Sequence, residues 1–168
     1  QYDVGLKEVL SPEIQKLFRP VPAKGSNFGL SGSSFWLRAD LKLAPGAPRE
    51  WLLEVAYPPL DRIELYVPDG RGAHVRELGG DTVPPAGRMA HRNHVLRVSL
   101  PAGDAHTLYM RISSQGPVSA PTSLWQPAAL WASDQVTFSA LSLYFGLLLG
   151  LLAYNLLLYF SVRDRAFV

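Results

Sequence analysis

The stretch that decides how this chain is organised runs from Gln135 to Val162 and reads QVTFSALSLYFGLLLGLLAYNLLLYFSV. No side chain in it is charged, whereas Asp134 precedes it and Arg163–Arg165 follow it. The hydrocarbon core of a bilayer is roughly 30 Å thick, which takes about 20 helical residues. The sequence therefore predicts one transmembrane helix over residues 133–162, with Ser133 or Asp134 as its N-cap.

The charges that flank this helix predict its orientation. Lys and Arg concentrate on the cytoplasmic side of membrane spans, and Arg163 and Arg165 follow this one directly. Residues 163–168 are therefore expected to begin a cytoplasmic loop, with residues 1–132 on the other side of the membrane. We also expect that a signal peptide has been removed ahead of Gln1 and that further membrane helices follow residue 168.

Small residues form a stripe along the predicted helix. Gly146 and Gly150 make a G-x-x-x-G pattern, which allows a second helix to approach closely. Asn155 lies off the stripe within the apolar region, where an amide without a partner favours contact with another helix. We predict a helix that packs against other membrane helices; the alternative is a lone anchor whose small residues are incidental.

The preceding residues alternate between apolar and polar side chains. In Phe35–Leu43 the odd positions are all apolar and the even positions are polar except Trp36, which is typical of a half-buried strand. Further strands are expected over 51–57, 62–67, 74–78, 95–100 and 107–113, separated by Pro and Gly turn signals. Residues 1–30 are expected to be a lead-in with a short helix capped by Ser11, and residues 114–131 to be mostly extended. Short, evenly spaced strands indicate a mainly β, antiparallel sandwich or barrel.

Composition and motifs exclude several functions. The net charge is only +2 and no basic run is present, so no nucleic-acid role is predicted. No G-x-S-x-G nucleophile elbow and no complete phosphate-binding glycine loop occurs, so we expect no enzyme in these residues. No metal site or cofactor is predicted, although Asp61 and Asp81 with neighbouring carbonyls offer the oxygen ligands that Ca²⁺ takes.

Polar and aromatic residues recur on one side of three predicted strands. They are Trp36 and Arg38, then Arg62, Glu64 and Tyr66, then Tyr109, Arg111 and Ser113. If the strands share a sheet, that face combines aromatic rings with Arg and carboxylate, the groups that bind sugar rings and hydroxyls. The alternative is that these side chains form cross-strand pairs that only stabilise the sheet, by about 0.2–1 kcal/mol each.

A second polar cluster lies in the predicted loop after residue 78. Asp81 is followed by Arg88, Arg92 and Asn93. These residues either line a pocket over one face of the sandwich, or Asp81 pairs with Arg88 or Arg92 and thereby pins the loop.

The ordered set of these features resembles a known family. Its residues are Asn27-Phe28-Gly29, Phe35-Trp36-Leu37-Arg38, Leu60 to Tyr66, Gly80-Asp81 with Arg88 and Arg92-Asn93, and Leu108 to Ile112. The chain resembles the type 2 extracellular sensory domain of bacterial seven-transmembrane receptors with diverse intracellular signalling modules (7TMR-DISM extracellular 2). Residues 146–158 and 163–165 resemble the first helix of the seven-helix region.

The resemblance implies a jelly-roll β-sandwich in the periplasm, similar to carbohydrate-binding modules, on a protein of the bacterial inner membrane. It also implies a cytoplasmic output, often a histidine kinase or a diguanylate cyclase. The expected ligand is a glycan or glycan-like molecule, and membrane lipid surrounds the helix. The expected ligand-binding residues are Trp36, Arg38, Asp61, Tyr66, Asp81, Arg88, Arg92, Tyr109 and Arg111. The alternative is an interaction module that binds a second receptor or a second copy of itself and has no small-molecule ligand.

Overall fold

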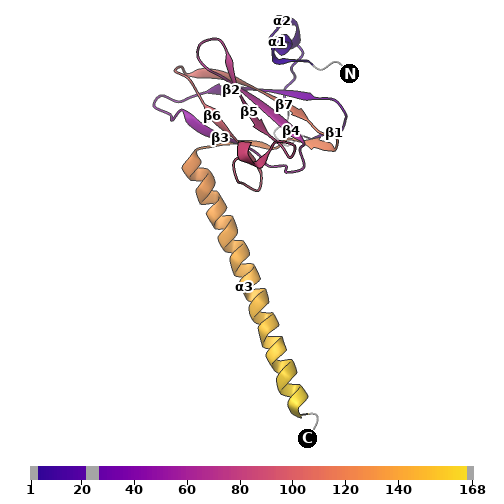
Figure 1. Cartoon of the computed structure of the whole chain (residues 1–168). Helices are drawn as coiled ribbons and strands as arrows, with labels where there is room; N and C mark the ends of the chain where they lie inside the picture. The colour runs from indigo at the N-terminus through magenta and orange to yellow at the C-terminus, as the bar shows by residue number, and fades with distance from the viewer. Residues whose placement is uncertain (1–3, 22–26, 166–168) are drawn as a thin grey trace. The chain divides into compact units, whose positions relative to one another are not determined.

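The computed structural model describes residues 4–21 and 27–165 (Figure 1). These residues form two compact units that divide after Pro127. The strands of the first unit are β1 (Asn27–Leu30), β2 (Phe35–Lys42), β3 (Glu50–Val55), β4 (Arg62–Pro68), β5 (His74–Gly79), β6 (His94–Ser99), β7 (Ala105–Ser113), β8 (Pro117–Ser119) and β9 (Thr122–Trp125). Its helical segments are α1 (Leu6–Val9), α2 (Pro12–Gln15) and the 3₁₀ turn η1 (Pro85–Gly87). The second unit contains most of α3 (Pro127–Arg165).

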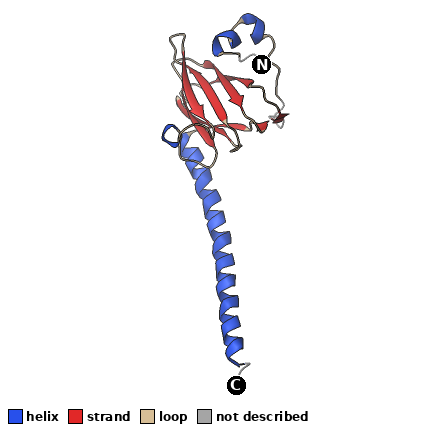
Figure 2. Ribbon diagram, turned by 45° about the vertical axis from the view of Figure 1, so that its right-hand side comes forward, coloured by secondary structure: helices blue, strands red, loops and turns tan. Residues whose placement is uncertain are grey.

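The described strands pair antiparallel in three sheets. A four-stranded sheet has the order β2-β7-β4-β5, a three-stranded sheet has the order β6-β3-β9, and β1 pairs with β8. Figure 2 shows these strands in red beside the two short N-terminal helices. The prediction of a mainly β, antiparallel domain followed by one long apolar helix is confirmed. The jelly-roll connectivity stays a prediction with which this strand order is consistent.

The core lies between the two larger sheets, because alternate residues of each strand point inward. The four-stranded sheet contributes Ile63, Leu65, Val67, Leu108, Met110 and Ile112, and the smaller sheet contributes Val55, Leu96 and Val98. Ile63, Val55 and Val98 are completely buried. Burying one such side chain stabilises the fold by about 1.5–3 kcal/mol, so the period-two pattern also sets the register of each strand.

The N-terminal lead-in contains more structure than expected. Ser11 caps α2 as predicted, and its hydroxyl accepts a hydrogen bond from the Ile14 amide at 3.5 Å. Two elements were missed. One is α1, and the other is β1, whose residues include Gly29 in the left-handed region at φ +72°. Both are only four residues long, so neither presents enough periodicity to be recognised from sequence.

Helix α3 begins six residues earlier than predicted, at Pro127 rather than residue 133. Proline suits the first turn of a helix because its missing N–H needs no partner there, and the Ala128, Ala129 and Leu130 that follow are strong helix formers. The proposed N-cap role of Ser133 or Asp134 is therefore wrong. The helix continues to Arg165, so the loop expected at 163–168 begins no earlier than residue 166. Residues 1–3, 22–26 and 166–168, including the expected mature terminus at Gln1, lie outside the described residues.

Candidate functional site

The three predicted rows of polar and aromatic residues lie on one face of one sheet. In the β2–β7 pair, Trp36 stands opposite Arg111 and Arg38 stands opposite Tyr109. In the β7–β4 pair, Tyr109 stands opposite Tyr66. These side chains alternate with the buried residues of the same strands, so they occupy the outer face of the four-stranded sheet. The structure thus brings together five of the nine residues that sequence reasoning assigned to a ligand site.

Glu64 is the most connected residue of this outer face. Its side chain is only 5% exposed, and Arg111 stands opposite it on β7. Its carboxylate accepts hydrogen bonds from the Tyr66 hydroxyl at 2.8 Å, from Arg62 Nε at 2.9 Å and from Arg111 Nη1 at 3.4 Å. Arg76 Nη1 lies 3.9 Å away. A buried carboxylate surrounded by several donors is stable in its charged form.

These contacts change two pKa values. Burial alone would raise the pKa of the Glu64 carboxyl, but the hydrogen bonds from Tyr66 and Arg62 and the charges of Arg62 and Arg111 outweigh it, so the pKa falls below its usual value. Burial, and then the hydrogen bond to Glu64, raise the pKa of the Tyr66 hydroxyl. Glu64 therefore remains negative and Tyr66 remains a hydrogen-bond donor at neutral pH.

The N-terminal segment contacts this face and covers part of it. The Trp36 indole N–H donates to the Val4 carbonyl at 3.1 Å. The Gln15 side-chain oxygen accepts from Arg38 Nη1 at 3.0 Å and from the Tyr109 hydroxyl at 3.3 Å. We call residues 4–21 the strap. The strap was expected to be a lead-in, and nothing in its sequence signalled that it would occupy the predicted binding face.

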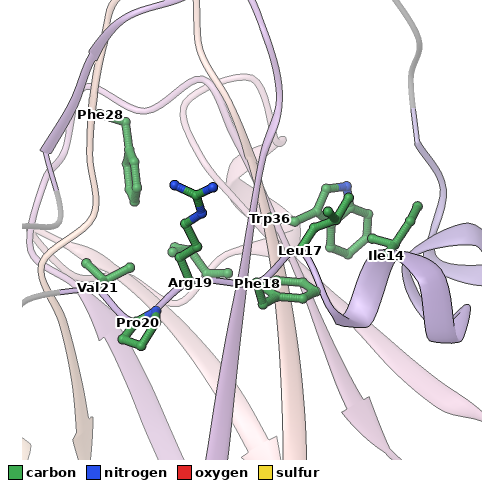
Figure 3. Close-up of a pocket in the computed structure, with 9 residues that line it drawn as sticks. Ile14, Leu17, Phe18, Arg19, Pro20, Val21, Phe28 and Trp36 are labelled. Carbon is green, nitrogen blue, oxygen red and sulfur yellow. The ribbon is translucent and has the colours of Figure 1, made fainter.

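Two neighbouring cavities lie where the strap meets β2. One has a volume of ≈ 450 Å³ and is lined by strap residues together with Phe28, Trp36 and Leu37; Arg19 is its one charged lining residue (Figure 3). The other has a volume of ≈ 490 Å³ and extends from the strap to inward-facing side chains of both sheets. Its polar lining includes Gln15, Arg38 and Asp40. Trp36 lines both cavities.

The walls of these cavities are held by specific contacts. The Trp36 ring stacks on Tyr66 with centroids 5.6 Å apart, and Phe18 of the strap lies 6.3 Å from the Tyr109 ring. Arg38 forms a two-point contact with Asp40, through Nε at 3.0 Å and Nη2 at 2.8 Å. The hydrogen bond from Arg38, and then that from Thr107, lower the pKa of the Asp40 carboxyl. The result is an aromatic wall beside a fixed ion pair.

The remaining predicted site residues lie elsewhere. Asp61 accepts a hydrogen bond from the Gln115 amide at 2.7 Å and thereby ties β4 to the β7–β8 connection. Asp81 and Arg88 form an ion pair at 3.5 Å, which is the loop-pinning alternative considered above, and they also line a third cavity together with Arg92. Within the described ranges, no group of three His, Asp or Glu residues is placed to hold a metal ion.

Sequence reasoning missed a buried acid on the smaller sheet. Glu54 is 7% exposed, and its carboxylate accepts from Asn93 Nδ2 at 2.6 Å and from the Trp125 indole at 2.8 Å. The alternation along β3 assigns Glu54 to the face opposite Leu53 and Val55, where a solvated acid is the simplest expectation. The sequence did indicate that this face is covered, because Leu52, two residues earlier on the same face, is apolar. In the structure Leu52 is 5% exposed.

The residues that form the strap and the strands also match a known protein family. The family described as 7TMR-DISM extracellular 2 matches residues 2–126. The chain belongs to this family. The 7TMR-DISM extracellular 2 match ends one residue before α3, so it covers the strap and all the strands but none of the helix. No curated relative matches the sequence.

The helix that follows the 7TMR-DISM extracellular 2 domain fits a membrane. Residues 127–162 have a mean hydropathy of 2.0 in their most apolar window, and none of that window is buried within the protein. A core helix of a soluble protein would be mostly buried, so this apolar surface requires a lipid or protein environment. The domain is therefore the extracellular sensory domain of a membrane receptor in the seven-transmembrane family.

The predicted packing residues of α3 are on this surface. Nothing within the described residues approaches the positions that a Cβ would occupy at Gly146 and Gly150. The Asn155 amide has a partner within its own helix, because Nδ2 donates to the Leu151 carbonyl one turn earlier at 2.7 Å. The role of these three residues in packing against other helices stays a prediction.

Proposed function

We propose that this 7TMR-DISM extracellular 2 domain senses a glycan-like ligand, which binds where the strap meets the outer edge of β2. The observation that carries the proposal is the ≈ 490 Å³ cavity, which places Trp36 and Phe18 beside the polar groups of Gln15, Arg38 and Asp40. Sites for small ligands commonly have volumes of about 300–1,000 Å³ and combine mostly apolar walls with a few polar groups. Sugars need both, because their ring faces are apolar and their hydroxyls are polar.

The contacts suggest how each residue would act. Stacking on Tyr66 fixes the Trp36 ring before the ligand arrives, so little conformational entropy is lost on binding. Asp40 likewise holds the Arg38 guanidinium in one orientation through its two-point contact. Donors and acceptors that are already oriented give specificity for hydroxyl positions.

Gln15 is the proposed link between ligand and strap. Its side-chain oxygen accepts from both Arg38 and Tyr109, which are the donors that a ligand hydroxyl would use. A ligand that takes over these donors releases Gln15 and changes the position of the strap. Ligand binding shifts such an equilibrium only by the difference in its affinity for the two strap positions.

The proposed output follows from the family. The receptor would lie in the bacterial inner membrane with this domain in the periplasm, because Arg163 and Arg165 follow the span on the side where positive charge is retained. Further membrane helices would pass the signal to a cytoplasmic histidine kinase or diguanylate cyclase.

The test is a glycan panel applied to the full chain in detergent, with binding measured by calorimetry. A sugar that binds wild type should lose at least tenfold in affinity in Trp36→Ala and in Arg38→Gln, since hydrogen bonds to charged groups are worth about 1.5–3 kcal/mol. Arg97→Gln is the matched control, because Arg97 is exposed on the smaller sheet. Binding that survives both cavity substitutions contradicts this site.

A second candidate is an interaction module, and exposed apolar side chains favour it. Leu17 is 72% exposed and Leu30 is 76% exposed, both in the N-terminal part of the domain. We propose in this case that the message is association with a second copy. Sedimentation of the full chain over a range of concentrations would then show self-association that Leu17→Ser and Leu30→Ser weaken, and no sugar would bind. Unchanged sedimentation in both variants would contradict this candidate.

A further inference from the structure

A third cavity lies apart from the strap. It has a volume of ≈ 220 Å³ and shares no lining residue with the two strap cavities. It is formed chiefly by residues 78–95, the segment that leads from β5 through η1 to β6, and by Pro58. We call it the loop pocket. Its volume is below the usual range for drug-sized ligands, so an occupant would have only a few heavy atoms.

Among the polar side chains that line the loop pocket, hydrogen-bond donors outnumber carboxylates. Arg88, Arg92, His91 and Asn93 contribute cationic or N–H groups, and Asp81 is the single carboxylate among the lining residues. Guanidinium groups match the planar, two-oxygen geometry of carboxylates and the oxygens of phosphates better than they match neutral polar groups. The composition therefore favours a small oxyanion.

Asp81 is the built-in competitor for such an anion. Its carboxylate lies 3.5 Å from Arg88 Nη1, and its side chain is 61% exposed while that of Arg88 is 30% exposed. A contact this long and this solvated is weak. Arg88 also has a contact that does not depend on Asp81, because its Nη1 donates to the Gly80 carbonyl at 3.1 Å. An entering oxyanion can thus displace Asp81 toward water while Arg88 stays in place.

Two hydrogen bonds connect the loop pocket to Trp125 at the end of β9. Asn93 lines the pocket and donates to the buried Glu54 carboxylate at 2.6 Å. The other Glu54 oxygen accepts from the Trp125 indole at 2.8 Å. Trp125 is the last residue of β9 and stands two residues before Pro127, the first residue of α3. A change in the position of Asn93 would therefore be felt at Trp125 through one carboxylate.

We propose that the loop pocket is a second ligand site, which takes a small oxyanion such as a phosphate or carboxylate group, and that Asn93, Glu54 and Trp125 transmit its occupancy to α3. Glu54 makes the route stiff, because a buried carboxylate must keep its donors. If Asn93 moves, Glu54 moves with it or loses a bond, and Trp125 responds in either case. This site is independent of the strap cavities, so failure of the sugar proposal leaves it untouched.

Binding is tested by calorimetry on the full chain in detergent, with inorganic phosphate and acetate as separate probes at constant ionic strength. Arg88→Gln should weaken binding by about tenfold or more, as expected for loss of a charge-assisted hydrogen bond. Asp81→Asn should strengthen it by about two- to fivefold, the worth of a partly exposed ion pair. Asp104→Asn, which removes an exposed acid elsewhere, should change nothing.

The two probes and the Asp81 variant decide the chemistry. Preference for phosphate or for acetate identifies which oxyanion the site favours. Weaker binding in Asp81→Asn means that Asp81 holds the ligand, which contradicts an anion site. Absence of binding by both probes also overturns the proposal.

Transmission is tested by NMR of ¹⁵N-labelled tryptophan indoles, with the Trp125 signal assigned from Trp125→Phe. Saturating the wild-type chain with the bound anion should shift the Trp125 signal, whereas the Trp51 signal should stay in place. Glu54→Gln should abolish the Trp125 shift yet leave the affinity within about twofold, because Glu54 does not line the pocket. A Trp125 signal that stays fixed in wild type, or that still shifts in Glu54→Gln, overturns the proposed route.

Discussion

Replacing Glu64 by Gln tests whether the outer face of the four-stranded sheet is held by charge. The substitution keeps the shape of the side chain and removes its charge and one acceptor oxygen. The cost depends on how well each donor can regain water. Arg62 and Arg76 have side chains that are 47% and 52% exposed, so each is rehydrated and loses little. Arg111 is only 19% exposed, so water replaces the lost carboxylate charge beside it less readily.

These contributions set the expected magnitude. Hydrogen bonds to a charged group are worth about 1.5–3 kcal/mol each, and the Tyr66 and Arg111 bonds are the two that water cannot easily replace. Because Gln retains one acceptor, we expect Glu64→Gln to lower the free energy of unfolding by about 2–4 kcal/mol, less than complete loss of two such bonds. For a domain of this size the midpoint of thermal unfolding should fall by roughly 10 °C.

The assay is urea unfolding of the full chain in detergent, followed by tryptophan fluorescence. The control is Asp40→Asn, which removes the same charge from an exposed position of the same face; its side chain is 60% exposed. The control should lose only a small part of what Glu64→Gln loses. Equal losses in the two variants would refute the reasoning, because burial would then not determine the cost.

The remaining predictions concern unfolding at low pH, the backbone conformation at Gly80 and the hydrophobic core. The folded pKa of Glu64 is below its unfolded value of about 4.3, so its stabilisation is complete above that pH and is lost as the pH falls through the folded pKa; acid unfolding curves of wild type and Glu64→Gln should converge there. Gly80→Ala should lower the free energy of unfolding, measured in urea, by more than about 1 kcal/mol, because Gly80 has φ +105° and a Cβ would lie 2.7 Å from the Arg62 Cα. An unchanged free energy of unfolding would contradict this backbone conformation. Ile63→Ala should cost about 2–5 kcal/mol in the same assay and Val75→Ala, at a 54% exposed position, well under 1; similar values would contradict the assigned core.

The site was only partly predictable, because periodicity describes strands and not loops. Alternation assigned Trp36 and Arg111 each to the polar side of its own strand. Their proximity followed once the two strands were known to pair. Asp61 and Asp81 were expected in the same site, but neither lies within the alternating strands, and the structure places both elsewhere. Loop positions carry no repeating signal, and their location depends on contacts that form only in the folded domain.

The amino-acid sequence by itself determined two properties, the alternating strands and the long uncharged helix. Both follow from local rules: a side chain's face is set by its position in the strand, and an apolar run of this length has no stable place in water. Only the tertiary structure decided that Gln15 of the strap binds Arg38 and that Glu54 is buried beneath Asn93 and Trp125. Those contacts join residues far apart in the chain, and their partners are chosen by which polar groups burial leaves in need of a hydrogen bond.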